Sequence, residues 1–475
     1  MPEARGSTAL IENRTFDEVA VGDSASVSRI VTKQDIELFA VVSGDVTPAH
    51  LDPAYAEAGM FQRVIAHGML GAGLISSVLG TRLPGPGTIY LGQELRFRHP
   101  VGIGDTVTAT VTVREKRAEK RILVLDCTRT NQDGRKVITG TAEVIAPTEK
   151  VSRPRVELPE VRLSRHEHLR NLLARAAGQP PVPTAVVHPG DAASLTAAVQ
   201  ASAAGLIVPL LVGPPARIHA AASAAKADVT PFRIVEAEDF ASAAERAVAM
   251  VQAGEAWMLM ASTSHAAELM HAILAAGTSL RTRRRLSHVY LMDIPGYPRP
   301  VMLTDTGVNI EPSLEAKRDI VQNAIDLAHV MGLELPRVAL LSAVETVNPK
   351  IRSTLDASVL CKMVDRGQIT GGLLDGPLGF DQALNPEAAA ESAIDSPVAG
   401  RADILVAPDL ESGTMLAKQL ISLLGADAAG VVLGARVPII LTSRAETERT
   451  WLASCAVAAI LARAREPASR NVAAS

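Results

Sequence analysis

Asp45 and His50 have the residue types and the spacing that general acid–base chemistry needs. They stand five positions apart in the segment SGDVTPAH, residues 43–50, where glycine and proline indicate a turn. Such a turn can direct a carboxylate and an imidazole toward one water molecule, so that one group takes a proton and the other returns one. Asp and His beside a proline also occur in ordinary turns, so the pair alone does not decide between catalysis and structure.

The residues after this turn predict a buried helix followed by an antiparallel sheet. Residues 64–79 are apolar nearly all round and rich in Gly, Ala and Ser, which suits a helix packed against a sheet on several sides. His67 and Gly68 stand at its start, where unpaired backbone N–H groups and the positive helix end favour a negative oxygen. Four alternating strand patterns follow, with a hairpin-type turn at residues 131–134: 88–97, 105–115, 122–130 and 135–145.

Residues 15–147 resemble the MaoC-like, hot-dog-fold family of (R)-specific enoyl-CoA hydratases. The stretches that carry the resemblance are SGDVTPAHLDPAYA, AHGML and LPGPGTIYLGQELRFRHPVGIGD. It implies an α+β hot-dog domain in which Asp45 and His50 activate the water that adds to a trans-2-enoyl thioester. It also implies that the backbone N–H of Gly68 holds the thioester oxygen while enolate charge develops there.

Three further residues belong to this expectation. Ser76 stands where the family keeps a serine near the catalytic pair, and His67 is predicted to fix the turn beside the substrate. Thr47 departs from the asparagine that the family usually has, and its hydroxyl can still bond to the turn backbone.

Length and composition indicate a larger protein than one such domain. At 475 residues the chain has room for two or three domains, since single cores rarely exceed about 250–300 residues. Its 47 Lys and Arg against 51 Asp and Glu give a net charge of −4, so we expect no nucleic-acid partner. The three cysteines have neither disulfide nor zinc spacing, and we expect them to serve packing. Without an apolar run of membrane-spanning length or a signal-peptide core, we expect a cytoplasmic protein with no membrane partner.

A second domain is predicted after a linker. Residues 148–165 contain prolines and mixed charge, which separates residues 1–147 from residues 166–475. In the later part, apolar strand-like runs alternate with Ala-rich helical stretches, which is typical of α/β folds with largely parallel sheets. The strand-like runs are 184–188, 206–212, 256–260, 289–291, 301–303, 338–342, 371–374, 404–407, 430–433 and 437–441.

The loop after the last of these runs could hold an anion. Thr442, Ser443 and Arg444 follow residues 437–441, and an arginine presents a rigid fork to phosphate oxygens. A loop with a solvated arginine is the simpler interpretation of the tripeptide taken alone.

Residues 166–470 resemble the phosphate acetyl/butyryl transferase family, whose fold is isocitrate/isopropylmalate dehydrogenase-like. The stretches include SHVYLMDIPGYPRPVMLTDTGVNIEPSLEAKRDIVQNAIDLA, ALLSAVETVNPKIRSTLDA and LGARVPIILTSRAE. The resemblance implies acyl transfer between CoA and inorganic phosphate, with Ser443 and Arg444 holding the phosphate and Thr442 beside them. Asp305 and Asn309 lie in a segment that the family places by its active site, although capping of a helix start explains the aspartate equally well.

The second resemblance has departures. The acetyl branch has an aspartate seven residues after the serine as base for the CoA thiol, and this chain has Thr450, with Glu446 or Glu448 as conceivable substitutes. A family Lys-Gly pair reads Ala261-Ser262, and a family asparagine reads Thr414.

The sequence therefore predicts a bifunctional enzyme with CoA thioesters and phosphate as substrates, no bound cofactor or metal, and a homo-oligomeric state. Three alternatives stay open: a hydratase fused to an impaired transferase-like domain, a hot-dog thioesterase, and a non-catalytic acyl-CoA-binding scaffold. The basic run at residues 281–285 is interpreted as a solvated helix end rather than a contact to CoA phosphates.

Overall fold

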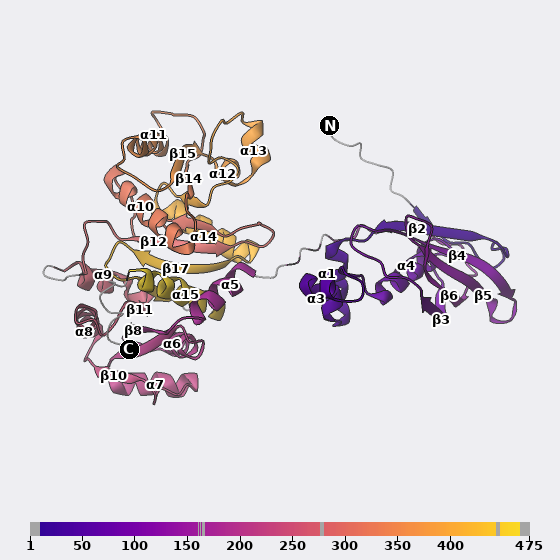
Figure 1. Cartoon of the computed structure of the whole chain (residues 1–475), viewed down its shortest axis with the longest axis horizontal. Coiled ribbons are helices and arrows are strands. Elements are labelled where there is room, and N and C mark those ends of the chain that lie inside the picture. Colours follow the sequence, from indigo (N-terminus) through magenta and orange to yellow (C-terminus); the bar gives the residue numbers. More distant parts are fainter. Residues whose placement is uncertain are drawn as a thin grey trace. The chain divides into compact units, whose positions relative to one another are not determined.

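The computed structural model describes residues 10–159, 161, 163, 167–275, 280–442 and 447–465. It divides into two compact units, Met1–Leu163 and Ser164–Ser475 (Figure 1). Each unit has its own hydrophobic core and is considered separately.

The first unit is an antiparallel sheet wrapped around one helix. The sheet order is β2-β4-β5-β6-β3, with β2 (Ser24–Ile30), β3 (Ile89–Phe97), β4 (Thr106–Arg117), β5 (Ile122–Thr130) and β6 (Lys136–Ile145). The central helix is α4 (Gly68–Thr81). Smaller elements are β1 (Leu10–Glu12), α1 (Lys33–Ser43), α2 (Pro48–Leu51), α3 (Pro53–Ala58), the short 3-10 helix η1 (Glu119–Arg121) and β7 (Ser152–Pro154). The predicted hot-dog arrangement is confirmed.

Strand alternation builds the core between this sheet and α4. In β4, Ala109, Val111 and Val113 are fully buried while their neighbours are partly exposed, because successive side chains of a strand point to opposite faces. They pack with Ile75 and Val78 of α4. This packing fixes the start of α4 relative to the turn that carries the candidate acid–base pair.

The predicted linker contributes one strand to the first unit. Residues 152–154 form β7, which pairs antiparallel with β1 through Leu10↔Pro154 and Glu12↔Ser152. The bounds of the linker, 148–165, stay a prediction.

The second unit contains an eleven-stranded mixed sheet, in the order β10-β9-β8-β11-β18-β17-β12-β13-β16-β14-β15. Its strands are β8 (Val182–Val187), β9 (Ile207–Gly213), β10 (Arg233–Glu236), β11 (Met258–Ser262), β12 (Ser287–Asp293), β13 (Val301–Thr304), β14 (Arg337–Leu341), β15 (Leu373–Leu378), β16 (Ile404–Val406), β17 (Asp427–Leu433) and β18 (Ile439–Thr442). Most neighbours are parallel, as predicted, but β12 runs antiparallel to both β13 and β17.

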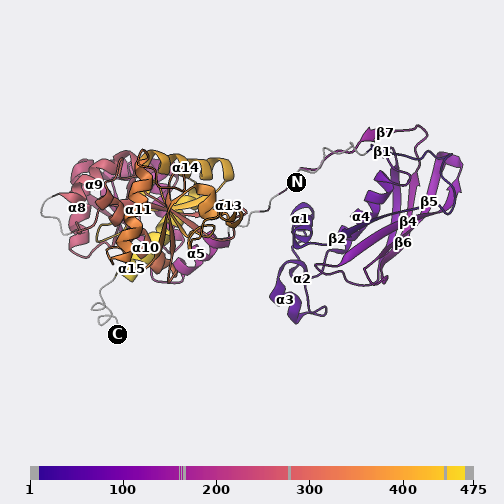
Figure 2. The same ribbon diagram turned by 90° about the horizontal axis from the view of Figure 1, so that it is seen from above.

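Helices cover both faces of this sheet (Figure 2). One face packs on α5 (Glu167–Ala177), α6 (Ala192–Ala203), α7 (Pro215–Ala225), α10 (Leu314–Met331), α11 (Arg352–Asp365) and α15 (Glu448–Ala464). The other packs on α8 (Phe240–Gln252), α9 (Ala266–Leu274), α12 (Phe380–Leu384), α13 (Pro386–Glu391) and α14 (Leu410–Leu424), and a second 3-10 helix, η2 (Thr263–His265), precedes α9. The strands between these layers are buried on both faces, which explains their continuous apolar runs.

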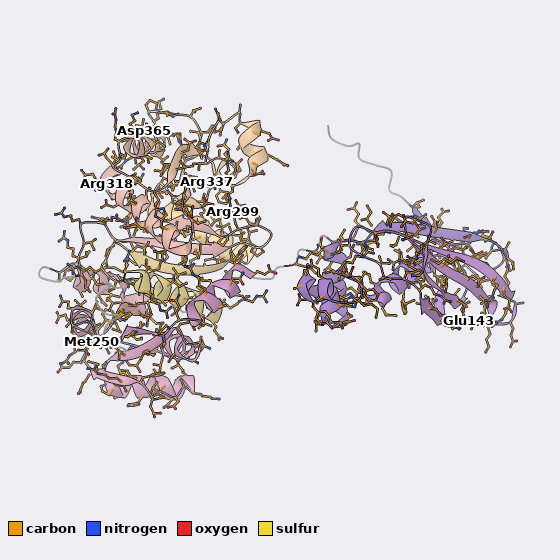
Figure 3. All side chains as sticks on the ribbon, in the orientation of Figure 1. Glu143, Met250, Arg299, Arg318, Arg337 and Asp365 are labelled. Carbon is orange, nitrogen blue, oxygen red and sulfur yellow. The ribbon has the colours of Figure 1, made fainter. Side chains whose placement is uncertain are left out.

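One buried carboxylate links the neighbouring strands β16 and β14 and the residues that precede β13. Asp403, just before β16, accepts the backbone N–H of Arg337 at 2.9 Å. The guanidinium groups of Arg299 and Arg337, labelled in Figure 3, lie 3.5 and 3.6 Å from its two oxygens.

Among the described residues, no helix has the length and apolar character to cross a membrane.

Candidate functional site

Asp45 lies in the connection between α1 and α2. Gly44 ends α1 in the left-handed region, with φ of 75°, and so turns the chain sharply before Asp45. Thr47 gives its hydroxyl to Asp45 rather than to the helix that it precedes: its Oγ1 donates to Asp45 Oδ1 at 2.6 Å, and its backbone N–H donates at 3.2 Å. The Thr47 hydroxyl, its N–H and the nearby imidazoles lower the pKa of Asp45, which is therefore a carboxylate at neutral pH.

His50 is held in one orientation by the next segment of chain. It stands on α2, which Pro48 starts, and its Nδ1 donates to the backbone oxygen of Ile65 at 2.7 Å. With Nδ1 carrying the proton in the neutral ring, Nε2 is left as the proton acceptor.

His67 joins these two groups. Its side chain is 2% exposed, its Nε2 donates to the backbone oxygen of Asp45 at 3.1 Å, and its ring lies 3.9 Å from that of His50. One side-chain atom each from Asp45, His50 and His67 lie within 4.8 Å of one another. The turn thus brings a carboxylate and two imidazoles to one point, where they could share a water molecule or hold a metal ion.

A cavity of about 290 Å³ opens beside the two imidazoles. Gly68, the first residue of α4, lines it together with His50 and His67, and the Gly68 N–H belongs to the first helical turn, which lacks helical acceptors. A methyl group on Gly68 would come within 2.9 Å of the Phe97 ring, so glycine leaves the space beside that N–H open. The other lining residues are Phe61, Ile65, Ala66, Phe97, Arg98, His99, Pro100, Val101, Arg129 and Ile138.

Ser76 is not brought to this cavity. It is exposed on α4 and is absent from the lining residues. Its catalytic role stays a prediction.

Arg129 lines the cavity and was not predicted from the sequence. The signal that could have identified it is a single arginine on the inward face of an alternating strand, the face that also carries Cys127 and Leu125.

In the second unit, the predicted phosphate-holding residues Ser443 and Arg444 lie outside the described residues. The strand that leads to them is described: Leu441 and Thr442 of β18 pair in parallel with Ala261 and Ser262 of β11. β18 therefore ends beside the end of β11, with the carboxyl ends of these two parallel strands side by side.

Asp305 and Asn309 form a buried network. Asp305 accepts the N–H groups of His288, Gly307 and Val308 through Oδ1 and that of Asn309 through Oδ2, at 3.0 to 3.2 Å. No helix starts at Asp305, since the next one begins at Leu314, so the capping interpretation is wrong: the carboxylate holds a loop. Asn309 donates to the Leu286 oxygen at 2.8 Å. Both side chains are engaged within the protein, and their contact with substrate stays a prediction.

The three departures from the transferase pattern are visible in the fold. Thr450 is buried in the first turn of α15, with its hydroxyl 3.1 Å from that of Thr447. Thr414 donates to the backbone oxygen of Thr306 at 3.1 Å, and Ala261 is buried in β11. Glu448 is exposed at the start of α15.

The described part of the basic run, residues 281–285, is a loop rather than a helix end. Arg284 forms an ion pair with Asp326, and the Arg285 Nε donates to Asn309 at 2.9 Å. Arg285 thus connects the chain before β12 to the Asp305 network, and Arg284 connects it to α10.

Comparison with protein families gives two matches. A family described as phosphate acetyl/butaryl transferase matches residues 240–459, and a family described as MaoC like domain matches residues 20–133. Among individual proteins, the phosphate acetyltransferase of Rhizobium meliloti is 55% identical over 297 residues, which cover 62% of this chain and 94% of that protein. The phosphate butyryltransferase of Clostridium acetobutylicum is 39% identical over 272 residues, covering 57% of this chain and 90% of that protein.

Two solved structures are also similar. A branched-chain phosphotransacylase from Enterococcus faecalis is 27% identical, with a TM-score of 0.53 over 59% of this chain and 99% of that structure. The (R)-hydratase PhaJ1 from Pseudomonas aeruginosa is 44% identical, with a TM-score of 0.32, and covers 33% of this chain and 100% of that structure.

Proposed function

Because the chain belongs to the phosphate acetyl/butyryl transferase family and carries a MaoC-like domain ahead of it, we propose that it is a bifunctional enzyme acting on CoA thioesters. The first unit hydrates trans-2-enoyl-CoA to (R)-3-hydroxyacyl-CoA. The second exchanges acyl groups between CoA and inorganic phosphate. The observation that carries the hydration proposal is the convergence of Asp45, His50 and His67 within 4.8 Å, with the two histidines lining the cavity.

In the proposed hydration, Asp45 orients the water and His50 transfers its proton. The Asp45 carboxylate accepts a hydrogen bond from the water. His50 Nε2 takes the other water proton as the oxygen bonds to the β-carbon of the thioester, and the ring then returns that proton to the α-carbon. The bond of Nδ1 to the Ile65 oxygen supports this role, since it keeps Nε2 directed at the reacting atoms.

The Gly68 N–H is proposed to stabilise the intermediate. As water adds, negative charge develops on the thioester oxygen, and a donor already aimed at that oxygen contributes about 3 kcal/mol to the transition state. The positive end of α4 acts in the same direction.

Hydration of crotonyl-CoA, followed as loss of the enoyl absorbance, tests this function. We expect Asp45→Asn and His50→Ala to lower kcat/KM by about 10²- to 10⁴-fold, the range of acid–base catalysis. Asp52→Asn is the matched control, because Asp52 caps α3 through the Ala54 and Tyr55 N–H groups and asparagine caps as well. Wild-type rates in the two site variants would remove Asp45 and His50 from the mechanism.

Release of free thiol from a saturated thioester separates hydration from thioesterase activity. A thioesterase would release free CoA from saturated butyryl-CoA without phosphate. The proposed hydratase site leaves the thioester bond intact, so no thiol appears until phosphate is added for the second unit.

For the second unit, phosphate-dependent release of free thiol from acetyl-CoA or butyryl-CoA is the test. Ser443 and Arg444 are proposed to hold the phosphate and the tetrahedral transition state, with Thr442 beside them. Arginine suits this role because its fork matches two phosphate oxygens. Family membership and the pairing of the end of β18 with the end of β11 support the assignment.

Thr450 favours a second candidate, a transferase domain of low turnover that binds CoA thioesters. A buried threonine whose hydroxyl faces Thr447 offers no base for the CoA thiol. Thr450→Asp separates the two candidates: a strong gain in thiol release would mean that a missing base limits the natural chain, whereas no gain would place the base elsewhere, with Glu448 the described alternative.

We also propose that the chain forms a homo-oligomer through the edge strand β3. This strand ends the sheet, so one row of its backbone groups has no partner strand. Its exposed side chains include Ile89, Tyr90, Leu91 and Phe97. Monomers rarely expose so apolar an edge, because it invites pairing with another strand.

A further inference from the structure

Arg129 is a buried cation in the wall of the candidate hydratase cavity. It lies on β5, on the same inward face as Cys127 and Leu125, and it is 3% exposed. Its Nε is fully buried and has no hydrogen-bond partner among the described residues. Burial alone lowers the pKa of Arg129 to about 10, which leaves the guanidinium charged at neutral pH.

The helix opposite makes room for this side chain. A methyl group at Gly71 of α4 would overlap Arg129 Nη1, so glycine there allows the guanidinium to lie between helix and sheet. Arg129 also lines a second cavity, and Asp35, which lines this second cavity, is the one acidic residue among those described that lines either of them. Asp35 is committed elsewhere: one oxygen accepts from Thr32 and the other pairs with Arg29.

A buried charge without a counter-ion is costly, and proteins usually pair such a group or use it to bind a ligand. The space in front of Arg129 is the cavity that His50 and Gly68 also line. Its other walls include Phe61, Val101 and Ile138, which suit the carbon chain of an acyl group. The unused fork of Arg129 matches the two oxygens of a carboxylate.

We propose that Arg129 is a specificity-determining residue of the first unit, and that it binds a carboxylate at the far end of a short trans-2-enoyl group. This inference rests on the proposed hydratase function and narrows its substrate class to enoyl thioesters of dicarboxylic acids. Arg129 lies between α4 and the sheet, beside the apolar walls of the cavity, so its proposed target is the end of the acyl group rather than the phosphates of CoA.

Two thioesters of equal carbon number test the proposal on the natural protein. Glutaconyl-CoA ends in a carboxylate and trans-2-pentenoyl-CoA ends in a methyl group. We expect the full-length protein to hydrate the first with a kcat/KM about 10- to 100-fold higher, the range of a charge-assisted hydrogen bond. An equal or higher kcat/KM with pentenoyl-CoA would overturn the proposal. That outcome covers the case in which a carboxylate from a second copy of the chain pairs with the Arg129 guanidinium.

Substitutions then assign the preference to Arg129. We expect R129M, which keeps the length of the side chain, to lose about 10- to 100-fold on glutaconyl-CoA, mostly through KM, and to retain hydration of pentenoyl-CoA. R129K should prefer glutaconyl-CoA less than the natural protein does and more than R129M does, because lysine keeps the positive charge but lacks the forked guanidinium. Unchanged discrimination in R129M would also overturn the proposal.

Inhibition of the natural protein by saturated thioesters needs no substitution, so it tests the proposal even if R129M does not fold. Saturated glutaryl-CoA should inhibit the natural protein at about tenfold lower concentration than valeryl-CoA, and equal inhibition constants would count against Arg129. Failure to hydrate crotonyl-, pentenoyl- and glutaconyl-CoA alike would overturn the hydratase function and this inference together. Hydration of crotonyl-CoA and pentenoyl-CoA without a preference for glutaconyl-CoA would overturn this inference and leave the hydratase function standing.

Discussion

One hydroxyl group, that of Thr47, lowers the pKa of the carboxylate proposed to activate water. It is the largest contributor to the lowered pKa of Asp45, ahead of the backbone N–H of the same residue and of His67 and His50. A donor to a carboxylate favours the charged form. The threonine therefore favours the carboxylate form of Asp45, which in the proposed reaction accepts a hydrogen bond from water.

We expect Thr47→Val to raise the pKa of Asp45 toward its ordinary value of 3.8. The backbone N–H of residue 47 remains in this variant, so part of the depression should persist. Titration of isotope-labelled aspartate by NMR measures the midpoint, and the acid limb of the hydration rate should move to higher pH with it. Thr108→Val, which removes a hydroxyl bonded only to Ser28, is the control. An unchanged Asp45 midpoint would contradict the assigned cause.

The sequence predicted the local part of the site and missed the distant part. Asp45, His50 and Gly68 could be grouped because a turn and a helix start are formed by neighbouring residues. Arg129 reaches the cavity from β5, and its contact with Gly71 depends on how helix and sheet pack, which no short motif encodes. Ser76 illustrates the converse: a helix turns about 100° per residue, so similarity at position 76 does not ensure that its side chain faces the cavity.

At the scale of elements, the start of α4 matters most for the proposed chemistry, because it presents the backbone N–H of residue 68. His67 precedes the helix with φ of −58° and ψ of 136°, a conformation that the residue before a proline also adopts. Position 68 is the first helical residue, where proline is tolerated. The donor at residue 68 can thus be removed without breaking the helix.

We expect Gly68→Pro to lower kcat for crotonyl-CoA by about 10²- to 10³-fold relative to Gly68→Ala, because only the proline removes the N–H group. Both substitutions add a Cβ near Phe97, so the alanine variant controls for crowding. The comparison is made at matched fold content, checked by circular dichroism. Equal activity of the two variants would mean that another group holds the thioester oxygen.

Element type was easier to predict than strand direction. Nine-residue and longer strands such as β4 and β6 alternate clearly and were found. β2 was missed because its SASVSRI sequence alternates serine with small apolar residues, and β10 was missed because it has only four residues. The antiparallel course of β12 and β17 had no signal, since strands buried on both faces read as apolar runs in either direction.

For the whole molecule, the exposed edge of β3 predicts self-association. We expect Ile89→Lys combined with Leu91→Lys to lower the molar mass in solution to that of a smaller assembly, because charged side chains block edge pairing. Ile89 and Leu91 are 57% and 50% exposed, so neither substitution disturbs the core. Light scattering after size-exclusion chromatography measures the mass. Val21→Lys, at a position 61% exposed and away from β3, is the control. A mass unchanged from that of the natural protein would direct the search to another surface.

The two units should work independently in the full chain, since each has its own core and the groups proposed for hydration all lie in the first. We expect Asp45→Asn to lower hydration by about 10²- to 10⁴-fold and to leave phosphate-dependent thiol release within about twofold, as for independent sites without shared partners. Ser443→Ala should do the reverse, lowering thiol release by about 10- to 100-fold through a lost phosphate contact. Both activities are measured on the same preparations, so unequal folding cannot mimic the result. If either substitution lowered both activities, the two sites would have to be coupled, and the fusion would serve a shared reaction cycle rather than two separate ones.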